Sequence, residues 1–133
     1  MTSSRVTREQ VSRACRRLPG AQLSYPFNEE TAVYKVAERI FAIVSEGVAP
    51  DRVTLKCDPD YGSYLVQQFE QITPGYHMNK RHWITVALTS HLSQDLVDQL
   101  VVDSYELIVA ALPVREREAL ASAARDGGHD AAR

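Results

Sequence analysis

Residues 21–57 contain several short segments in which apolar and polar residues alternate, and no helical period separates these segments. Three of them, 33–36, 40–44 and 52–57, are rich in the β-branched residues that favour strands. A parallel pair of strands needs a crossover of a dozen or more residues, so strands that follow one another this closely pair antiparallel. The segment therefore predicts an antiparallel meander with one packed face and one face open to water.

Helical periods surround these strands. The first predicted helix covers 7–19, where Thr7 and Gln10 have the spacing of a capping box, and the second covers 58–73. The third covers 93–113 and is the longest. The residues expected to line one face of the second helix are Tyr61, Tyr64, Leu65 and Phe69.

A further strand is predicted at 83–88, between the second and third helices. The order of elements predicts an α+β fold: a single antiparallel sheet of about five or six strands with helices packed on one face. Consecutive βαβ units are missing from the pattern, which argues against a doubly wound parallel sheet. We expect one domain over 1–113, followed by a C-terminal helical extension with a disordered tail over 114–133.

The amino-acid composition limits which classes of protein and partner fit this sequence. Lys and Arg number 15 against 17 Asp and Glu, so the formal net charge is -2, and any anionic partner would meet a local basic patch. No uncharged apolar run approaches the ~18 residues of a membrane span, and the first residues do not resemble a signal peptide. Cys15 and Cys57 are far apart and are expected in the core of a protein from a reducing compartment. We predict a cytoplasmic monomer.

The densest group of functional side chains lies at 76–83, which holds Tyr, Trp, Lys, Arg and two His. Cations that contact phosphates and rings on which bases stack are what a nucleic-acid site needs. The alternative is structural, with Trp83 in the core and Lys80 and Arg81 in a solvated turn. The first helix would add to the site if its basic face lay on the same side; that face carries Arg8, Arg13, Arg16 and Arg17.

The sequence offers little for a metal or for catalysis. His77 and His82 are five residues apart and His91 is nine further on, without the carboxylate or cysteine that would complete a ligand set. No GxSxG, GxxxxGK or GxGxxG string occurs, and Ser104 lies inside an apolar stripe where a small residue serves packing. We therefore expect neither a cofactor nor an enzyme.

A series of motifs, in order and correctly spaced, resembles the MmcQ/YjbR family over residues 7 to 113. They are LPGA, YPF, VYKV, RIFAIV, TLKCDP, PGYHMNKRHWITV and DSYELIVAALP. The resemblance implies a fold like that of frataxin and its bacterial homologue CyaY, and DNA binding of a "double wing" type. It implies a site at the matching polar and aromatic positions, namely Lys56, Tyr76, His77, Asn79, Lys80, Arg81, His82 and Trp83. Glu38-Arg39 replaces the usual Gly-Lys of the family, so this hairpin is expected to differ in shape.

The leading hypothesis is a small non-enzymatic domain that binds DNA through these residues. An alternative is a protein-interaction module whose sheet face or long helix docks a partner, and for it we expect a fully buried Trp83 and acids paired with Lys80 and Arg81. A third is a small-molecule or enzymatic site near His77, His82 and Cys57. Iron handling by analogy with frataxin fits less well, because the first helix is basic where an iron site needs acids.

Overall fold

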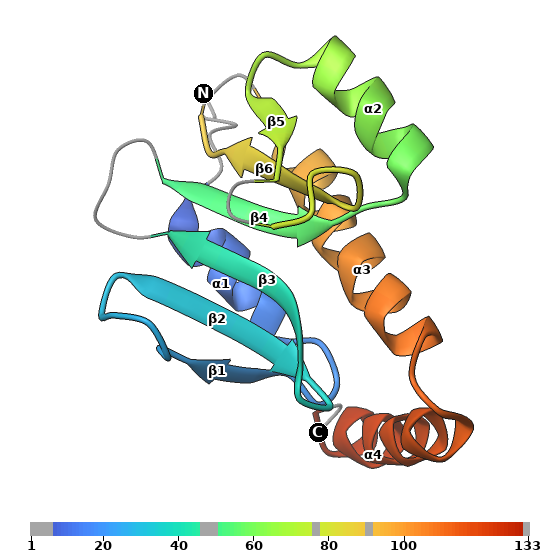
Figure 1. Cartoon of the computed structure of the whole chain (residues 1–133). Coiled ribbons are helices and arrows are strands. Elements are labelled where there is room, and N and C mark those ends of the chain that lie inside the picture. Colours follow the sequence, from blue (N-terminus) through green and yellow to red (C-terminus); the bar gives the residue numbers. More distant parts are fainter. Residues whose placement is uncertain (1–6, 46–50, 76–77, 90–91, 132–133) are drawn as a thin grey trace.

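The computed structural model describes residues 7–45, 51–75, 78–89 and 92–131. In chain order its elements are α1 Arg8–Arg16, β1 Gln22–Ser24, β2 Thr31–Val36, β3 Arg39–Ser45, β4 Arg52–Lys56, α2 Pro59–Gln68, β5 Ile72–Pro74, β6 Trp83–Ala87, α3 Gln94–Ala110 and α4 Val114–Ala131 (Figure 1). The expected helix starts are confirmed: Thr7 forms a capping box with Gln10, and Ser93 caps α3. Of these helices, none is long and apolar enough to cross a bilayer.

The strands form one six-stranded antiparallel sheet in the order β1-β2-β3-β4-β6-β5, so the α+β prediction is confirmed. One boundary was wrong. The second helix was expected to reach residue 73, but α2 ends at Gln68 and the chain turns extended at Phe69. Ile72 is then buried opposite Val86 in the short edge strand β5. An edge strand tolerates Pro74, which cannot donate to a ladder.

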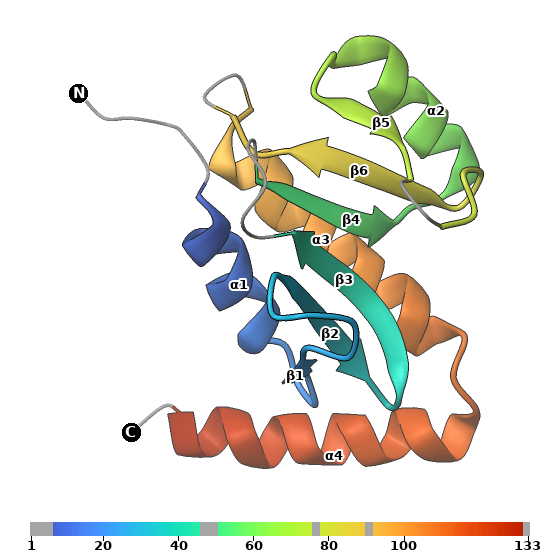
Figure 2. The ribbon, with the colours of Figure 1, turned by 60° about the vertical axis from the view of Figure 1, so that its left-hand side comes forward.

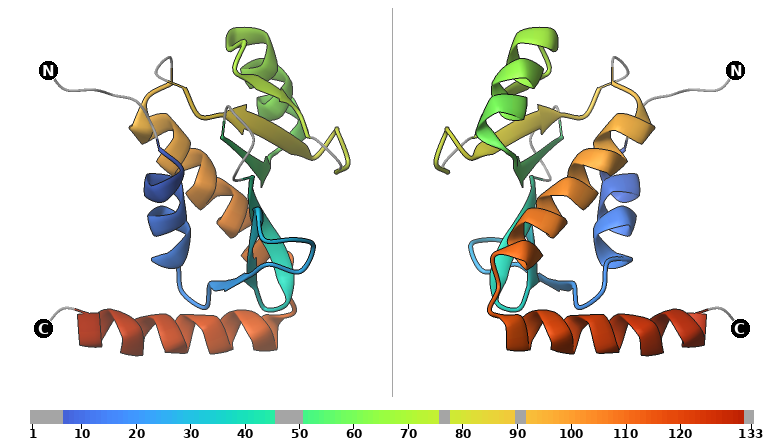
Figure 3. Two further views of the ribbon diagram at one scale, coloured as in Figure 1. Left: turned by 90° about the vertical axis from the view of Figure 1, so that its left-hand side faces the viewer. Right: turned by 90° about the vertical axis from the view of Figure 1, so that its right-hand side faces the viewer.

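Helices cover one face of this sheet. Side-on views place α1 and α3 together on the same side (Figure 3), and α3 contacts β2, β3 and β4. Ser104 of α3 is fully buried and donates a hydrogen bond of 2.7 Å to the Phe41 carbonyl, while its hydroxyl accepts one of 2.9 Å from the Lys56 N–H. The Tyr105 ring meets the Phe41 ring edge-on at 5.4 Å between centroids. This face therefore forms the core.

The other face of the sheet, which we call the open face, is covered by none of the helices in the described residues (Figure 3). The strand register places Val33, Ile43, Thr54 and Thr85 in one row across it. Alternate residues of the strands lie on the same side, except at the register shift between β2 and β3, where Phe41 is unpaired and faces the core. Thr54 and Thr85 share a hydrogen bond of 3.0 Å between their hydroxyls. The polar alternates of the meander led us to expect a face open to water, but burial on this face is uneven: Val33, Thr54 and Thr85 are buried, whereas Lys35 and Lys56 are half-buried.

The β2–β3 hairpin turns through Ala37 and Glu38, whose φ angles are 50° and 69°. Two-residue hairpins favour positive φ at both central positions because that twist matches the strands, but such angles cost side-chain-bearing residues free energy. This tight hairpin thus forms with Glu38 at a position of positive φ, where the family resemblance implies that glycine is usual.

Helix α4 runs across the end of the molecule below β1 and β2 (Figure 2). It touches the rest of the chain near Gly20, where an added Cβ would lie 2.5 Å from a methyl carbon of Leu120. Gly20 has a φ of 74°, which suits glycine at this close approach. The helical extension expected after residue 113 is present, and α4 continues to Ala131, into the segment for which we expected disorder.

Candidate nucleic-acid interface

The predicted site residues divide between two neighbouring places, the end of strands β4 and β6 and the connection from β5 to β6. Six of the eight, Lys56, Asn79, Lys80, Arg81, His82 and Trp83, lie in the described part of the chain, whereas Tyr76 and His77 lie outside it. The two places are joined because the hydrogen-bond ladder between β4 and β6 continues past the ends of these strands: the Cys57 N–H donates to the His82 carbonyl at 2.8 Å.

The β5–β6 connection is shaped by Gly75, Asn79 and Trp83. The Gly75 N–H donates to the Trp83 carbonyl at 2.7 Å, and a Cβ at position 75 would lie 2.5 Å from the Trp83 Cβ. Asn79 Oδ1 accepts from the Arg81 N–H at 2.9 Å, and its carbonyl accepts from the His82 N–H at 3.2 Å. Because an Asn that bonds the backbone two residues on forms a turn, Asn79 serves here to shape the loop.

Lys80 and Arg81 follow in this turn and are both exposed. The Lys80 ammonium donates to the Gly75 carbonyl at 3.4 Å, which draws it toward the base of the loop. Among the described residues, neither cation forms an ion pair. The acid pairing expected for the protein-interaction alternative is therefore not met within these residues, whereas the exposed turn expected by the structural alternative is present.

Lys56 and Trp83 lie opposite each other on β4 and β6 at the end of the open face nearest this loop. Both side chains are half-buried. Trp83 is therefore neither fully buried, as the structural alternative required, nor a freely projecting ring. An amphipathic ring in this position offers part of its surface to a ligand while its remainder packs on the sheet.

The open face is basic and rich in hydroxyls. Its strand positions carry Lys35, Arg52 and Lys56, and none of the described strand residues on this side is an acid. Lys35 and Arg52 were not among the predicted site residues. The period-2 alternation that placed Lys56 on the polar side of its strand also applies to these two, so the signal was available.

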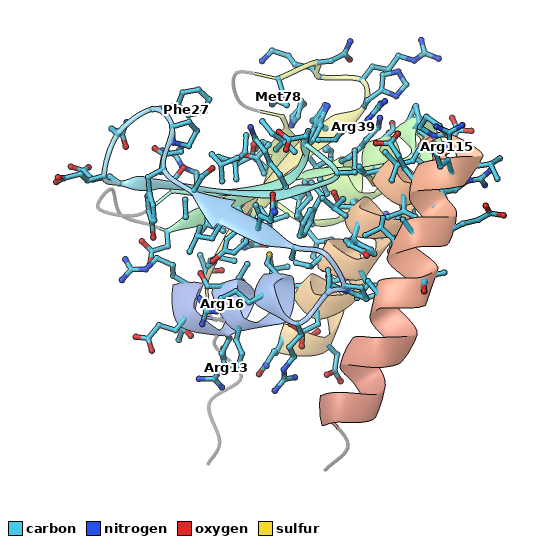
Figure 4. The ribbon with its side chains drawn as sticks, turned by 90° about the horizontal axis from the view of Figure 1, so that it is seen from below. Arg13, Arg16, Phe27, Arg39, Met78 and Arg115 are labelled. Carbon is cyan, nitrogen blue, oxygen red and sulfur yellow. The ribbon has the colours of Figure 1, made fainter. Side chains whose placement is uncertain are left out.

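Two loops rise on the open side of the sheet. Viewed from below, Phe27 and Met78 lie above the sheet, one in each loop (Figure 4). Phe27 is 66% exposed, which is unusual for so large an apolar side chain. In the same view Arg13 and Arg16 of α1 lie below the sheet, on the covered side. The basic face of α1 is thus on the other side of the molecule and adds nothing to this surface.

A cavity of about 290 Å³ opens behind Lys80 and Arg81. It lies between α2 and the ends of β5 and β6, and its walls include Ser63, Val66, Pro74 and Ile84. We call it the cationic cavity. Helix α2 fits closely here because it has Gly62 against the Ile84 side chain, where an added Cβ would already be 3.4 Å away.

A second cavity, of about 280 Å³, lies between α2 and α3 and is lined by Cys57, Asp58, Tyr61, Asp103, Glu106 and Leu107. We call it the acidic cavity. Tyr61 and Tyr64 stack beside it at 6.3 Å between centroids, and both are exposed. Of the four apolar and aromatic residues predicted on one face of this helix, Leu65 is fully buried and Phe69 half-buried, whereas the two tyrosines remain exposed.

The structure gives no support to a reactive cysteine. Cys57 is buried, and burial, with Asp58 and Asp103 nearby, raises the pKa of its thiol to about 11, so the thiol stays protonated at neutral pH. Cys15 is also buried and free, as expected of a core cysteine. His82 is exposed, His91 lies outside the described residues, and within those residues no three His, Cys, Asp or Glu side chains form a metal-binding group.

The sequence model of the YjbR family matches residues 16–107, more than half of the chain. This chain is a member of the YjbR family. Among curated YjbR-family relatives, the uncharacterized protein YbdF of Escherichia coli O157:H7 is 36% identical over 110 residues, covering 83% of this chain and 90% of that protein. The uncharacterized protein YjbR of Escherichia coli K12 is 33% identical over 115 residues, covering 86% and 98%.

Solved structures show the same YjbR-family fold. The crystal structure of the Deinococcus radiodurans protein DR2400, a DUF419 domain, superimposes with a TM-score of 0.83 at 34% identity and covers 90% of this chain and 91% of that one. A protein from Pseudomonas syringae superimposes with a TM-score of 0.65 at 26% identity, covering 77% and 98%. The relatives thus fix the family and the fold, and their names assign no activity.

Proposed function

We propose that this protein is a non-enzymatic, cytoplasmic DNA-binding domain that acts as a monomer. The observation that carries the proposal is the sign of the charge on two neighbouring parts of the molecule: Lys35 and Lys56 on the open face, and Lys80 and Arg81 in the adjoining loop. Described strand residues on this face add no acid, and the two loop cations form no ion pair with described residues. Such a surface attracts phosphates although the whole protein carries a net charge of -2.

Aromatic rings give this surface a second kind of contact. Trp83 lies across from Lys56, and the exposed Phe27 stands on the same side of the sheet. Rings beside cations suit nucleic acids, because the cations hold phosphates and the rings stack on bases or wedge between them. The open face therefore fits a nucleic acid better than it fits an acidic protein, which would offer no bases to stack.

The protein-interaction alternative receives less support. It expected a buried Trp83 and acid-paired Lys80 and Arg81, and the described residues depart from both expectations. A non-enzymatic role is supported by the buried, protonated Cys57 and by Ser104, whose hydroxyl is fully buried and engaged with two backbone groups. Neither side chain is available as a nucleophile.

The test is fluorescence anisotropy of labelled duplex and single-stranded DNA at several salt concentrations. Four phosphate contacts give a slope of log affinity against log salt of about -3 to -4. Lys80→Ala/Arg81→Ala should lower the affinity and reduce the slope by about 2, whereas Arg13→Ala/Arg16→Ala, an equal loss of charge on the covered side, should change little. No binding at low salt, or equal losses in the two double variants, would refute the proposal.

A further inference from the structure

The cationic cavity has the size and shape of a site for a small molecule. Its volume of about 290 Å³ is near the lower end of the range for ligand sites, which begins at roughly 300 Å³. One water molecule occupies about 30 Å³ of liquid, so the cavity has room for a ligand of about ring size with a short substituent. A flat strip of surface cannot select a ligand by shape, but a cavity of this size can.

The walls of the cavity are chemically divided. Val66, Pro74 and Ile84 give it an apolar side, and Lys80 and Arg81 give it a cationic one. No acid is among its lining residues, in contrast to the acidic cavity on the same helix, which has three. Apolar walls favour burial of a hydrocarbon group, and fixed cations determine where a charged group sits.

The two cations are held in place by the loop that carries them. Lys80 is drawn to the Gly75 carbonyl, and the Arg81 backbone is fixed by Asn79 Oδ1. Because the backbone is already ordered, less entropy is lost when a ligand binds. A guanidinium with no ion partner among the described residues is suited to a carboxylate or phosphate, which it can contact through two parallel hydrogen bonds.

We infer that the cationic cavity binds a small organic anion, a carboxylate or phosphate monoester carrying an apolar group of about ring size. The apolar group packs between Val66 and Ile84, and the acid group is held by Lys80 and Arg81. Ser63 supplies a hydroxyl in the same wall. This site goes beyond the proposed DNA surface: it shares the two loop cations with that surface, but it also needs Ser63 and Val66 of α2, which are not part of that surface.

The experiment is isothermal titration calorimetry at low ionic strength with phenyl phosphate and phenylacetate as probes. Inorganic phosphate tests charge without an apolar group, and benzyl alcohol tests an apolar group without charge. At least one of the two organic anions should bind about tenfold or more tightly than both control compounds, since charge-assisted hydrogen bonds and apolar burial each contribute on the order of a tenfold change. If inorganic phosphate binds as tightly as both organic anions, the inference is wrong.

Two variants locate the site. Arg81→Ala should lower the affinity for the probe about tenfold. Arg115→Ala, which removes an exposed arginine from α4, should leave that affinity unchanged. Ser63→Trp adds a bulky ring at an exposed helix position that lines the cavity, so it should abolish probe binding without changing the charge. Unchanged affinity in Ser63→Trp, with folding checked by circular dichroism, would overturn the site.

Ser63→Trp also separates this inference from the proposed function. The variant keeps every cation of the DNA surface, so its DNA affinity should equal that of the wild type even where probe binding is lost. If DNA binding is absent in the wild type but the organic anion binds, only the proposed function fails. If DNA binds and neither organic anion does, only the cavity inference fails.

Discussion

The same strands form both faces of the sheet, but the side chains on the two faces differ in burial and in charge. On the covered face, alternate residues such as Phe41, Val53 and Leu55 are completely buried beneath the helices. On the open face, the residues between them include Lys35 and Lys56, which are half-buried and basic. Because a strand alternates its side chains, one strand contributes both to the core and to the surface that we propose binds DNA, so neighbouring positions of one strand can differ in role.

The difference between the two faces is tested most directly by truncating one residue on each face of β3. Phe41→Ala should lower the free energy of unfolding by about 3–5 kcal/mol, because it removes a fully buried ring that meets Tyr105 and Tyr34. Ile43→Ala, on the half-buried open side, should cost clearly less; the register shift between β2 and β3 leaves Phe41 unpaired, so Phe41 faces the helices although it lies two positions from Ile43. Urea unfolding followed by circular dichroism measures both. Equal losses would mean that the open face is also covered in solution.

Much of the covered face was predictable from sequence. The strand alternation, the capping box at Thr7, the core positions of Cys15 and Cys57 and the packing role of Ser104 all depend on local patterns, and all are confirmed. The double hydrogen bond of Ser104 could not be predicted, because its partners come from β3 and β4, which are distant in sequence.

The open face and its loop were harder to predict because contacts between distant residues decide them. Residues throughout the motif at 74–83 were expected to take part in binding. In the structure, Gly75 and Asn79 shape the loop, whereas Lys80 and Arg81 are exposed. Similarly, the early end of α2 follows from the pairing of β5 with β6, which no local pattern in that helix signals.

A smaller loss of stability is expected from a substitution in α3, at a position where this helix packs on the covered face. Ser104→Ala should cost about 1–3 kcal/mol, because the Lys56 N–H loses its acceptor and the Phe41 carbonyl loses its donor, both in buried surroundings. The matched control is Ser63→Ala, an exposed serine in α2, which should change stability by less than about 0.5 kcal/mol. A neutral Ser104→Ala would show that water replaces the hydroxyl.

The covered face should also appear in the pH dependence of stability. Burial raises the pKa of the Cys15 thiol from its ordinary value of 9.0 to about 12. The stability from this neutral thiol is present below pH 9 and is lost as the pH rises from 9 toward 12, by about 1.4 kcal/mol per pH unit, because only the unfolded chain releases the proton. Cys15→Ala should therefore lose stability less steeply above about pH 9 than the wild type. Equal slopes in urea titrations would contradict the burial of Cys15.

The smallest change in stability is expected for substitutions on the open face, and these substitutions test most directly how the two faces differ. Lys35→Ala and Lys56→Ala should each alter the free energy of unfolding by about 0.5 kcal/mol or less, because both side chains are half-buried and form no ion pair with described residues. Together they should reduce the salt slope of DNA binding by about 2, since each lysine is proposed to neutralise one phosphate.

Arg13→Ala/Arg16→Ala removes the same charge from α1, on the covered side of the sheet. If binding falls equally in both double variants, net charge and not the open face attracts the DNA. If binding falls only in Lys35→Ala/Lys56→Ala while stability stays constant, the two faces of one sheet carry separable functions, since the residues that hold the fold are then not the residues that hold the ligand.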